Sequence, residues 1–124
     1  MKKNNKGFTL AELLIVVAII AVLVAISIPM FAGQLTKARE STNQANVRAA
    51  EAAAVADYLG DKDHKDSQQY EYDVASGTVK DATFTASSLT KVAAITDVTG
   101  TTIENIYVEV SEANGAVAYV KYKS

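Results

Sequence analysis

The sequence predicts an α+β protein in which a long N-terminal α-helix, hydrophobic in its first half, packs through its second half on a small antiparallel β-sheet. Residues 13–26 are all apolar, and beyond residue 69 the hydrophobic pattern changes to an alternation of period two. The alanine-rich stretch from Leu35 to Leu59 contains neither Gly nor Pro, which favours helix. A chain of 124 residues leaves room for one small domain beside this helix.

The charge is unevenly distributed. Lys2, Lys3 and Lys6 precede the apolar block, and no acidic residue comes before Glu12. These three lysines are part of the 12 basic side chains, so residues 8–124 carry 9 basic and 14 acidic side chains, a formal charge of −5. We therefore expect no direct binding of nucleic acid, which depends on clustered Lys and Arg. Cysteine is absent, so the domain holds together by packing without disulfides.

The N-terminal third is typical of a membrane segment. The 21 residues from Phe8 to Ile28 are interrupted only by Thr9, Glu12 and Ser27, and a helix of that length spans about 30 Å. A cleaved secretory signal with its cleavage site near Ser27 is the alternative. Gly7 directly before the block and Glu12 inside it favour retention of the helix. A carboxylate at the centre of such a segment costs roughly 2.5 to 3.5 kcal/mol, and such residues tend to have a use.

Residues 6–13, Lys-Gly-Phe-Thr-Leu-Ala-Glu-Leu, resemble the processing site of type IV pilins and pseudopilins, which are prepilins with a class III leader and an N-terminal methylation motif. The resemblance implies that residues 1–7 are a basic leader, cut between Gly7 and Phe8 by a prepilin peptidase that also methylates the new Phe8 amine. Residues 8–28 are then the transmembrane and assembly half of the helix. The resemblance also implies that the acid at Glu12 stays ionised and pairs with a neighbouring subunit's N-terminal amine.

The resemblance covers about the first 35 residues and includes Pro29. Pro29 lacks an amide hydrogen and is expected to kink or loosen the helix; a helix boundary at the membrane surface is the alternative. The resemblance implies that the stretch before this proline unwinds in the filament, although Ala21 stands where many Gram-negative pilins have a glycine. The absence of the disulfide found in many Gram-negative pilins favours a Gram-positive pilin or a minimal pseudopilin.

Residues 29–59 are predicted to be the amphipathic second half of the same helix, which runs from Thr9 to Leu59 and ends at Gly60 as a C′ residue. A free coiled coil and a disordered stalk are the alternatives. Small side chains at spacings of three and four predict the face that packs, widened by Val47, Val55 and Tyr58. The members of this predicted face are Ala38, Thr42, Ala45, Ala49, Ala52, Ala56 and Leu59.

Residues 60–124 are predicted to form a small β-sheet domain that begins with a charged surface loop at 60–69. Asp61, Asp63 and Asp66 suggest calcium, but the Gly and Glu positions of an EF-hand loop are missing. We therefore predict no metal site and no cofactor. His64, the only histidine, is interpreted as a solvated loop side chain.

Alternating residues from Tyr70 onwards, a turn at Ser76–Gly77 and the stretch Thr78–Thr85 predict two strands. Ser87 and Ser88 suggest the N-cap of a short helix that reaches Ile95. Ile103–Ser111 and Ala116–Tyr122 predict a hairpin whose turn contains Asn-Gly. The sheet is expected to have three or four strands. The tyrosines at 70, 72, 107, 119 and 122 are explained by sheet packing or by a contact surface.

The sequence contains no catalytic constellation, so we do not expect an enzyme. The leading prediction is a structural subunit of a type IV pilus, held in the cytoplasmic membrane as a single-pass prepilin and then part of a cell-surface filament. Its expected partners are identical or related pilin subunits, the prepilin peptidase and methylase, an assembly ATPase and a platform protein. The alternatives are a pseudopilin of a type II secretion or competence (DNA-uptake) system, and a bitopic membrane protein with a ligand-binding sheet domain.

Overall fold

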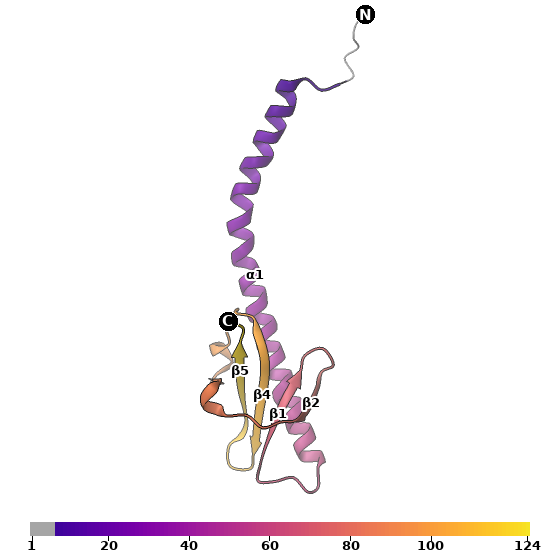
Figure 1. Ribbon diagram of the computed structural model, residues 1–124, viewed down its shortest axis with the longest axis vertical. Helices are drawn as coiled ribbons and strands as arrows, with labels where there is room; N and C mark the ends of the chain where they lie inside the picture. The colour runs from indigo at the N-terminus through magenta and orange to yellow at the C-terminus, as the bar shows by residue number, and fades with distance from the viewer. Residues whose placement is uncertain (1–6) are drawn as a thin grey trace, which may run out of the picture. The chain divides into compact units, whose positions relative to one another are not determined.

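The computed structural model describes residues 7–124, so the predicted leader 1–7 lies outside the described residues except for Gly7. A single long helix, α1 (Leu10–Gly60), is followed by strands β1 (Ser67–Asp73) and β2 (Thr78–Asp81) (Figure 1). The chain continues through the 3₁₀ turn η1 (Ala86–Ser88), β3 (Thr90–Val92), η2 (Ile95–Asp97), β4 (Ile103–Ser111) and β5 (Gly115–Tyr122). The predicted α+β fold is confirmed.

The first of two compact units ends at Leu35 and contains residues 10–35 of α1. Every described side chain in this unit is exposed, including the apolar ones. The stretch is long and apolar enough to cross a membrane. α1 continues through Pro29, so the alternative in which this proline ends the helix is wrong.

The second unit, Thr36–Ser124, contains the rest of α1 and the sheet. One helix face is buried here, and its residues recur every three or four positions: Asn43, Val47, Ala50, Ala54 and Tyr58. The small-residue face predicted from the sequence is therefore wrong, because all seven of its members are exposed. The larger apolar area of Val47 and Tyr58 contributes more on burial than an alanine stripe does, and it decides which face turns inward. The exposed alanine stripe consists of Ala38, Thr42, Ala45, Ala49, Ala52 and Ala56.

The sheet has five antiparallel strands in the order β2-β1-β4-β5-β3. β4 is central and pairs with β1 and β5, with Tyr70 opposite Val108 and Val108 opposite Ala118. The turns of both hairpins contain a glycine with positive φ, Gly77 at 71° and Gly115 at 69°, a conformation that other residues rarely adopt. The predicted C-terminal hairpin is confirmed within one residue.

The middle of the domain differs from the prediction. Strand β2 ends at Asp81, four residues before the expected end at Thr85, and the predicted helix from Ser87 is instead η1, β3 and η2. β3 pairs with β5, so tertiary pairing outweighed the local helical pattern. Gly60 is helical and lacks the positive φ of a C′ residue.

The core lies between the buried face of α1 and one face of the sheet. Strands β4 and β5 contribute the alternate residues Ile106, Val108, Val110, Ala118 and Val120. Tyr70 of β1 is 1% exposed, so sheet packing, and not a contact surface, explains the tyrosine at this position. Burial, followed by the negative charges of Asp57 and Asp81, raises the pKa of Tyr70 to about 12.

A loop between η2 and β4 is fastened to the first turns of α1 within this unit. Asn43, 7% exposed, donates its two amide hydrogens to the carbonyls of Thr99 at 2.8 Å and Thr101 at 2.9 Å. Between these residues Gly100 lies against the helix, where an added Cβ would be 2.6 Å from the Thr36 carbonyl oxygen. Only glycine allows the loop backbone to lie this close to the helix. Asn43 provides hydrogen-bond donors for the two loop carbonyls on either side of that glycine.

Replacing Gly100 with alanine is expected to destabilise the second unit by about 1–3 kcal/mol, because the methyl group overlaps helix backbone. All six tyrosines lie in this unit, so near-UV circular dichroism of the full chain in micelles follows its thermal unfolding. Gly60→Ala is the matched control, since an added Cβ there meets nothing within 4 Å. Equal melting temperatures for the two variants would contradict the close approach.

Candidate functional site

The predicted processing residues lie directly before the helix. Gly7 and Phe8 precede α1, which begins at Leu10. Phe8 is 79% exposed, and an added Cβ at Gly7 meets no atom within 4 Å. The peptide bond between them is therefore accessible and is not held in helical hydrogen bonding. A protease needs an accessible segment of this kind.

Glu12 and Thr9 form a capping box at the start of α1. The backbone N–H of Thr9 donates to Glu12 Oε2 at 3.2 Å, and the backbone N–H of Glu12 donates to Thr9 Oγ1 at 3.2 Å. Two amides at the helix start thereby find acceptors. The Thr-x-x-Glu spacing is a known sequence signature of this cap, so the role of Thr9 was accessible from the sequence but was not predicted.

The carboxylate of Glu12 stands in apolar surroundings. The neighbouring Leu10, Leu13 and Val16 are exposed apolar side chains, and Glu12 forms no ion pair with any residue between Gly7 and Ser124. Its negative charge also lies at the helix N-terminus, where the helix dipole favours an anion. The site is thus a capped carboxylate that still has room for a cationic partner.

The charged loop after α1 is held by hydrogen bonds and a ring contact. Asp61 accepts a hydrogen bond from the Asp63 N–H at 3.0 Å, and no group of three potential metal ligands occurs among the described residues. His64 is half-buried: its ring stacks on Tyr58 at 4.1 Å, and Nδ1 lies 2.7 Å from the Asp61 carbonyl oxygen. The interpretation of His64 as a solvated side chain is therefore wrong.

The comparisons with known proteins agree with these N-terminal features. Residues 2–28 match the family model described as prokaryotic N-terminal methylation motif. The chain is 39% identical over 62 residues to "Fimbrial protein EcpC" of Eikenella corrodens, covering 50% of this chain and 40% of that protein. It is 48% identical over 46 residues to "Type IV major pilin protein PilA" of Myxococcus xanthus (strain DK1622), covering 37% of this chain and 21% of the relative.

A third relative is "Type IV major fimbrial protein FimA" of Dichelobacter nodosus, 51% identical over 41 residues, which are 33% of this chain and 26% of the relative. The chain thus spans less than half the length of each of these curated relatives. No solved structure matches it significantly.

Replacing Thr9 with valine removes the hydroxyl acceptor and keeps the side-chain shape. We expect amide hydrogen exchange at Glu12 to become about fivefold faster in micelles, the equivalent of a cap contributing about 1 kcal/mol. Ser27→Ala is the control, because Ser27 Oγ donates to the Leu23 carbonyl inside the helix and caps nothing. Unchanged exchange at Glu12 in the Thr9 variant would show that the cap does not form.

Proposed function

We propose that this chain, which belongs to the type IV pilin family through its N-terminal segment, is a structural subunit of a type IV pilus filament. The observation that carries the proposal is the match of residues 2–28 to the methylation motif, together with the exposed apolar surface that follows it. Relatives named as fimbrial and major pilin proteins support a pilus over a secretion or competence pseudopilus. The role is structural, with no catalysis of its own.

Processing is the first step of the proposed route. The prepilin is held in the cytoplasmic membrane by residues 8–28, and a prepilin peptidase cuts the bond between Gly7 and Phe8 and methylates the new amine. The exposure of Phe8 and the open space around Gly7 support this assignment. An assembly ATPase and a platform protein then move the subunit from the membrane into a cell-surface filament.

Assembly is proposed to use the charge of Glu12. A carboxylate and an amine are each costly in an apolar environment, and pairing them offsets part of that cost. The new Phe8 amine of one subunit is the proposed partner of Glu12 in its neighbour. Because one oxygen of Glu12 is already used by Thr9, the pairing adds a partner at the other oxygen and leaves the cap in place.

The exposed helix surface supplies the rest of the proposed contact. The apolar side chains of residues 10–35 suit lipid before assembly and other helices after it. The exposed alanine stripe at residues 38–56 lets a neighbouring backbone approach closely, as small residues do at helix–helix contacts. Pro29 lies within the apolar stretch 10–35 of α1. We propose that it loosens the helix there during assembly.

Changing Gly7 to leucine should leave the leader attached when the chain is co-expressed with a prepilin peptidase, because the bulky side chain blocks the cleavage position. Intact-mass spectrometry of the wild type should show the loss of residues 1–7 and the gain of one methyl group on Phe8. Gly33→Leu is the control, since this glycine is also exposed but lies inside α1. An uncut wild-type chain would refute the processing step and favour a bitopic membrane protein.

Changing Glu12 to alanine should leave cleavage and membrane insertion intact but lower the yield of sheared surface filaments at least about tenfold, because a buried amine loses its counter-charge. Glu12→Gln separates the two roles of this residue, because an amide oxygen can still accept from the Thr9 N–H but carries no charge. Both variants should fail in assembly. Abundant fibres of normal length in electron micrographs of the glutamine variant would remove the charge pair from the mechanism.

A further inference from the structure

The loop between η2 and β4 draws three segments together where α1 enters the second unit. Gly100 of this loop lies against Thr36, the first residue of the unit, and its carbonyl oxygen accepts from Arg39 Nη1 at 3.5 Å. The carbonyl of Thr102 accepts the backbone N–H of Lys123 at 2.8 Å. The segments that meet here, 36–43, 97–104 and 121–124, are called the proximal end.

The opposite end of the unit is held by contacts of its own. Tyr58 Oη donates to the Lys65 carbonyl oxygen at 2.6 Å. The backbone N–H of Glu112 donates to the Asp66 carbonyl oxygen at 3.1 Å, and His64 Nε2 lies 3.7 Å from Glu112 Oε1. The last turn of α1, the loop after it and the β4–β5 turn therefore meet, and residues 57–66 and 111–115 are called the distal end.

The two ends differ in the sign of their charge. The proximal end has four basic and three acidic side chains, whereas the distal end has two basic and five acidic ones, with its histidine counted as neutral. The remainder of residues 36–124 has three basic and five acidic side chains. An anionic surface therefore attracts the proximal end and repels the rest of the unit. The charged residues of the proximal end are Lys37, Arg39, Glu40, Asp97, Glu104, Lys121 and Lys123.

Three cations of the proximal end have no counter-charge within the described chain. Lys121 Nζ pairs with Glu104 Oε2 at 3.2 Å, so these two charges cancel. Lys37, Arg39 and Lys123 are exposed and form no ion pair with any residue from Gly7 to Ser124. These three side chains are therefore able to reach an anion outside the protein.

The two other acids of the proximal end are already engaged by neutral donors. Glu40 Oε1 accepts from Gln44 Nε2 at 3.5 Å, and Asp97 Oδ2 accepts the Ala94 N–H at 2.9 Å as part of the cap of η2. Neither carboxylate forms an ion pair with a described residue. Their charges reduce the positive balance of this end without holding its cations in place.

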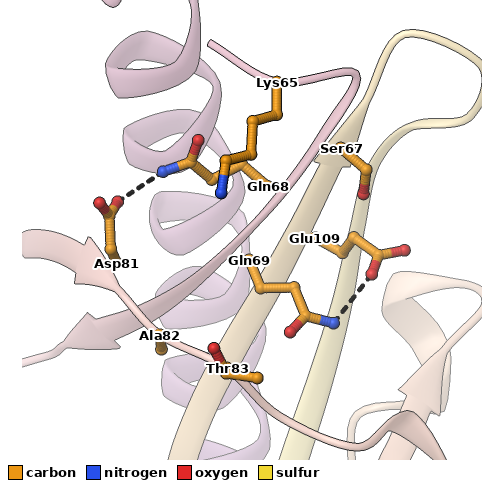
Figure 2. A pocket seen from close by; sticks show the side chains of 8 residues that line it. All are labelled: Lys65, Ser67, Gln68, Gln69, Asp81, Ala82, Thr83 and Glu109. Carbon is orange, nitrogen blue, oxygen red and sulfur yellow. Dashed lines mark hydrogen bonds between the residues drawn. The ribbon is translucent and has the colours of Figure 1, made fainter.

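A lysine of the distal end has a different environment. Figure 2 shows Lys65 at a cavity whose lining also includes Asp81 and Glu109. Two carboxylates at the same cavity oppose the approach of a phosphate. The distal end therefore does not offer a second cationic surface, and it supplies lysines that serve as controls.

The position of the proximal cations along α1 matches the far head-group layer of a bilayer. No charged residue lies between Glu12 and Lys37, and residues 13–36 span about 36 Å at about 1.5 Å per residue. The hydrocarbon core of a bilayer is about 30 Å thick, and the bilayer is about 40–45 Å thick with its head groups. A helix that enters the core at Glu12 therefore brings Lys37 and Arg39 to the lipid phosphates on the other side.

We propose that the proximal end rests on the membrane surface before assembly, with Lys37, Arg39 and Lys123 binding the phosphates of anionic phospholipids. The proposal rests on the membrane insertion of the chain put forward above, and it adds a second, electrostatic contact to the apolar one. The negative balance of the distal end keeps that end away from the same surface. The charge distribution thus determines which end of the unit faces lipid.

The test is NMR of the full chain in bicelles of phosphatidylcholine, alone or with about one lipid in four replaced by anionic phosphatidylglycerol. The anionic lipid should shift the amide signals of Lys37, Arg39 and Lys123 and leave those of Lys62 and Lys65 in place. Raising the salt concentration to about 0.3 M should reverse at least about half of the shift, because salt screens charges. Absence of proximal shifts, or shifts of the same size at both ends, would overturn the proposal.

A dissolved anion is the competing source of the same chemistry. Glycerol phosphate added to neutral bicelles, at the total concentration of the anionic lipid, should shift these signals much less, because it is not gathered on a surface next to the helix. Shifts of equal size would assign the three cations to a free phosphate and refute the contact with lipid.

The double variant Lys37→Gln with Lys123→Gln should lose at least about half of the lipid-dependent shift of Arg39, since two of the three unpaired cations are gone. The matched control, Lys62→Gln with Lys65→Gln, removes the same charge from the distal end and should keep the full shift. Dispersed spectra show that both variants are folded. An undiminished shift in the proximal variant, or the same loss in both, would refute the assignment. A chain that enters neither kind of bicelle would instead refute membrane insertion, and this proposal with it.

Discussion

Apolar surface that the chain cannot cover by itself is the constraint on which the rest of the molecule depends. Along residues 10–35 the large hydrophobic side chains are exposed, Leu13 at 49% and Phe31 at 70% among them. At about 25 cal/mol per Å², so much uncovered surface is not tolerated in water. Surface of this kind suits lipid or the apolar faces of other helices. The helical backbone satisfies its own hydrogen bonds in either setting, which makes the same segment compatible with both.

In the second unit, by contrast, the apolar face of the same helix is buried. The sheet covers its residues Val47, Ala50, Ala54 and Tyr58. No cysteine is present to reinforce so small a domain. Each polar side-chain group that becomes buried there therefore needs a hydrogen-bond partner. Asn43 is the buried polar side chain of the described core, and both of its amide hydrogens are used. No buried side-chain nitrogen or oxygen in residues 7–124 is left without a hydrogen-bond partner.

The features that were predictable from the sequence are those set by local pattern. The length of α1, the terminal hairpin and the alternation of Val108 and Tyr107 follow from periodicity and turn chemistry. The packing face of α1 was not predictable from small residues, because burial depends on the area that the sheet presents. The path of residues 82–97 was also missed, since β3 exists only by pairing with β5. At the N-terminus the residues of the processing motif stand out in the sequence, whereas the hydrogen bond between Gln69 and Glu109 arises only when distant strands meet.

The strand order has a consequence for the time at which the domain forms. The central strand β4 pairs with β1, which comes much earlier in the sequence, so Tyr70 meets Val108 only after a long loop of chain has closed. Loop closure of this kind slows folding relative to the local contacts of a helix. During synthesis α1 emerges first, and its backbone hydrogen bonds join residues only four apart in the sequence, so they can form as soon as the helix has emerged. The sheet has to wait for its last two strands, so α1 is complete while the sheet is still unfolded.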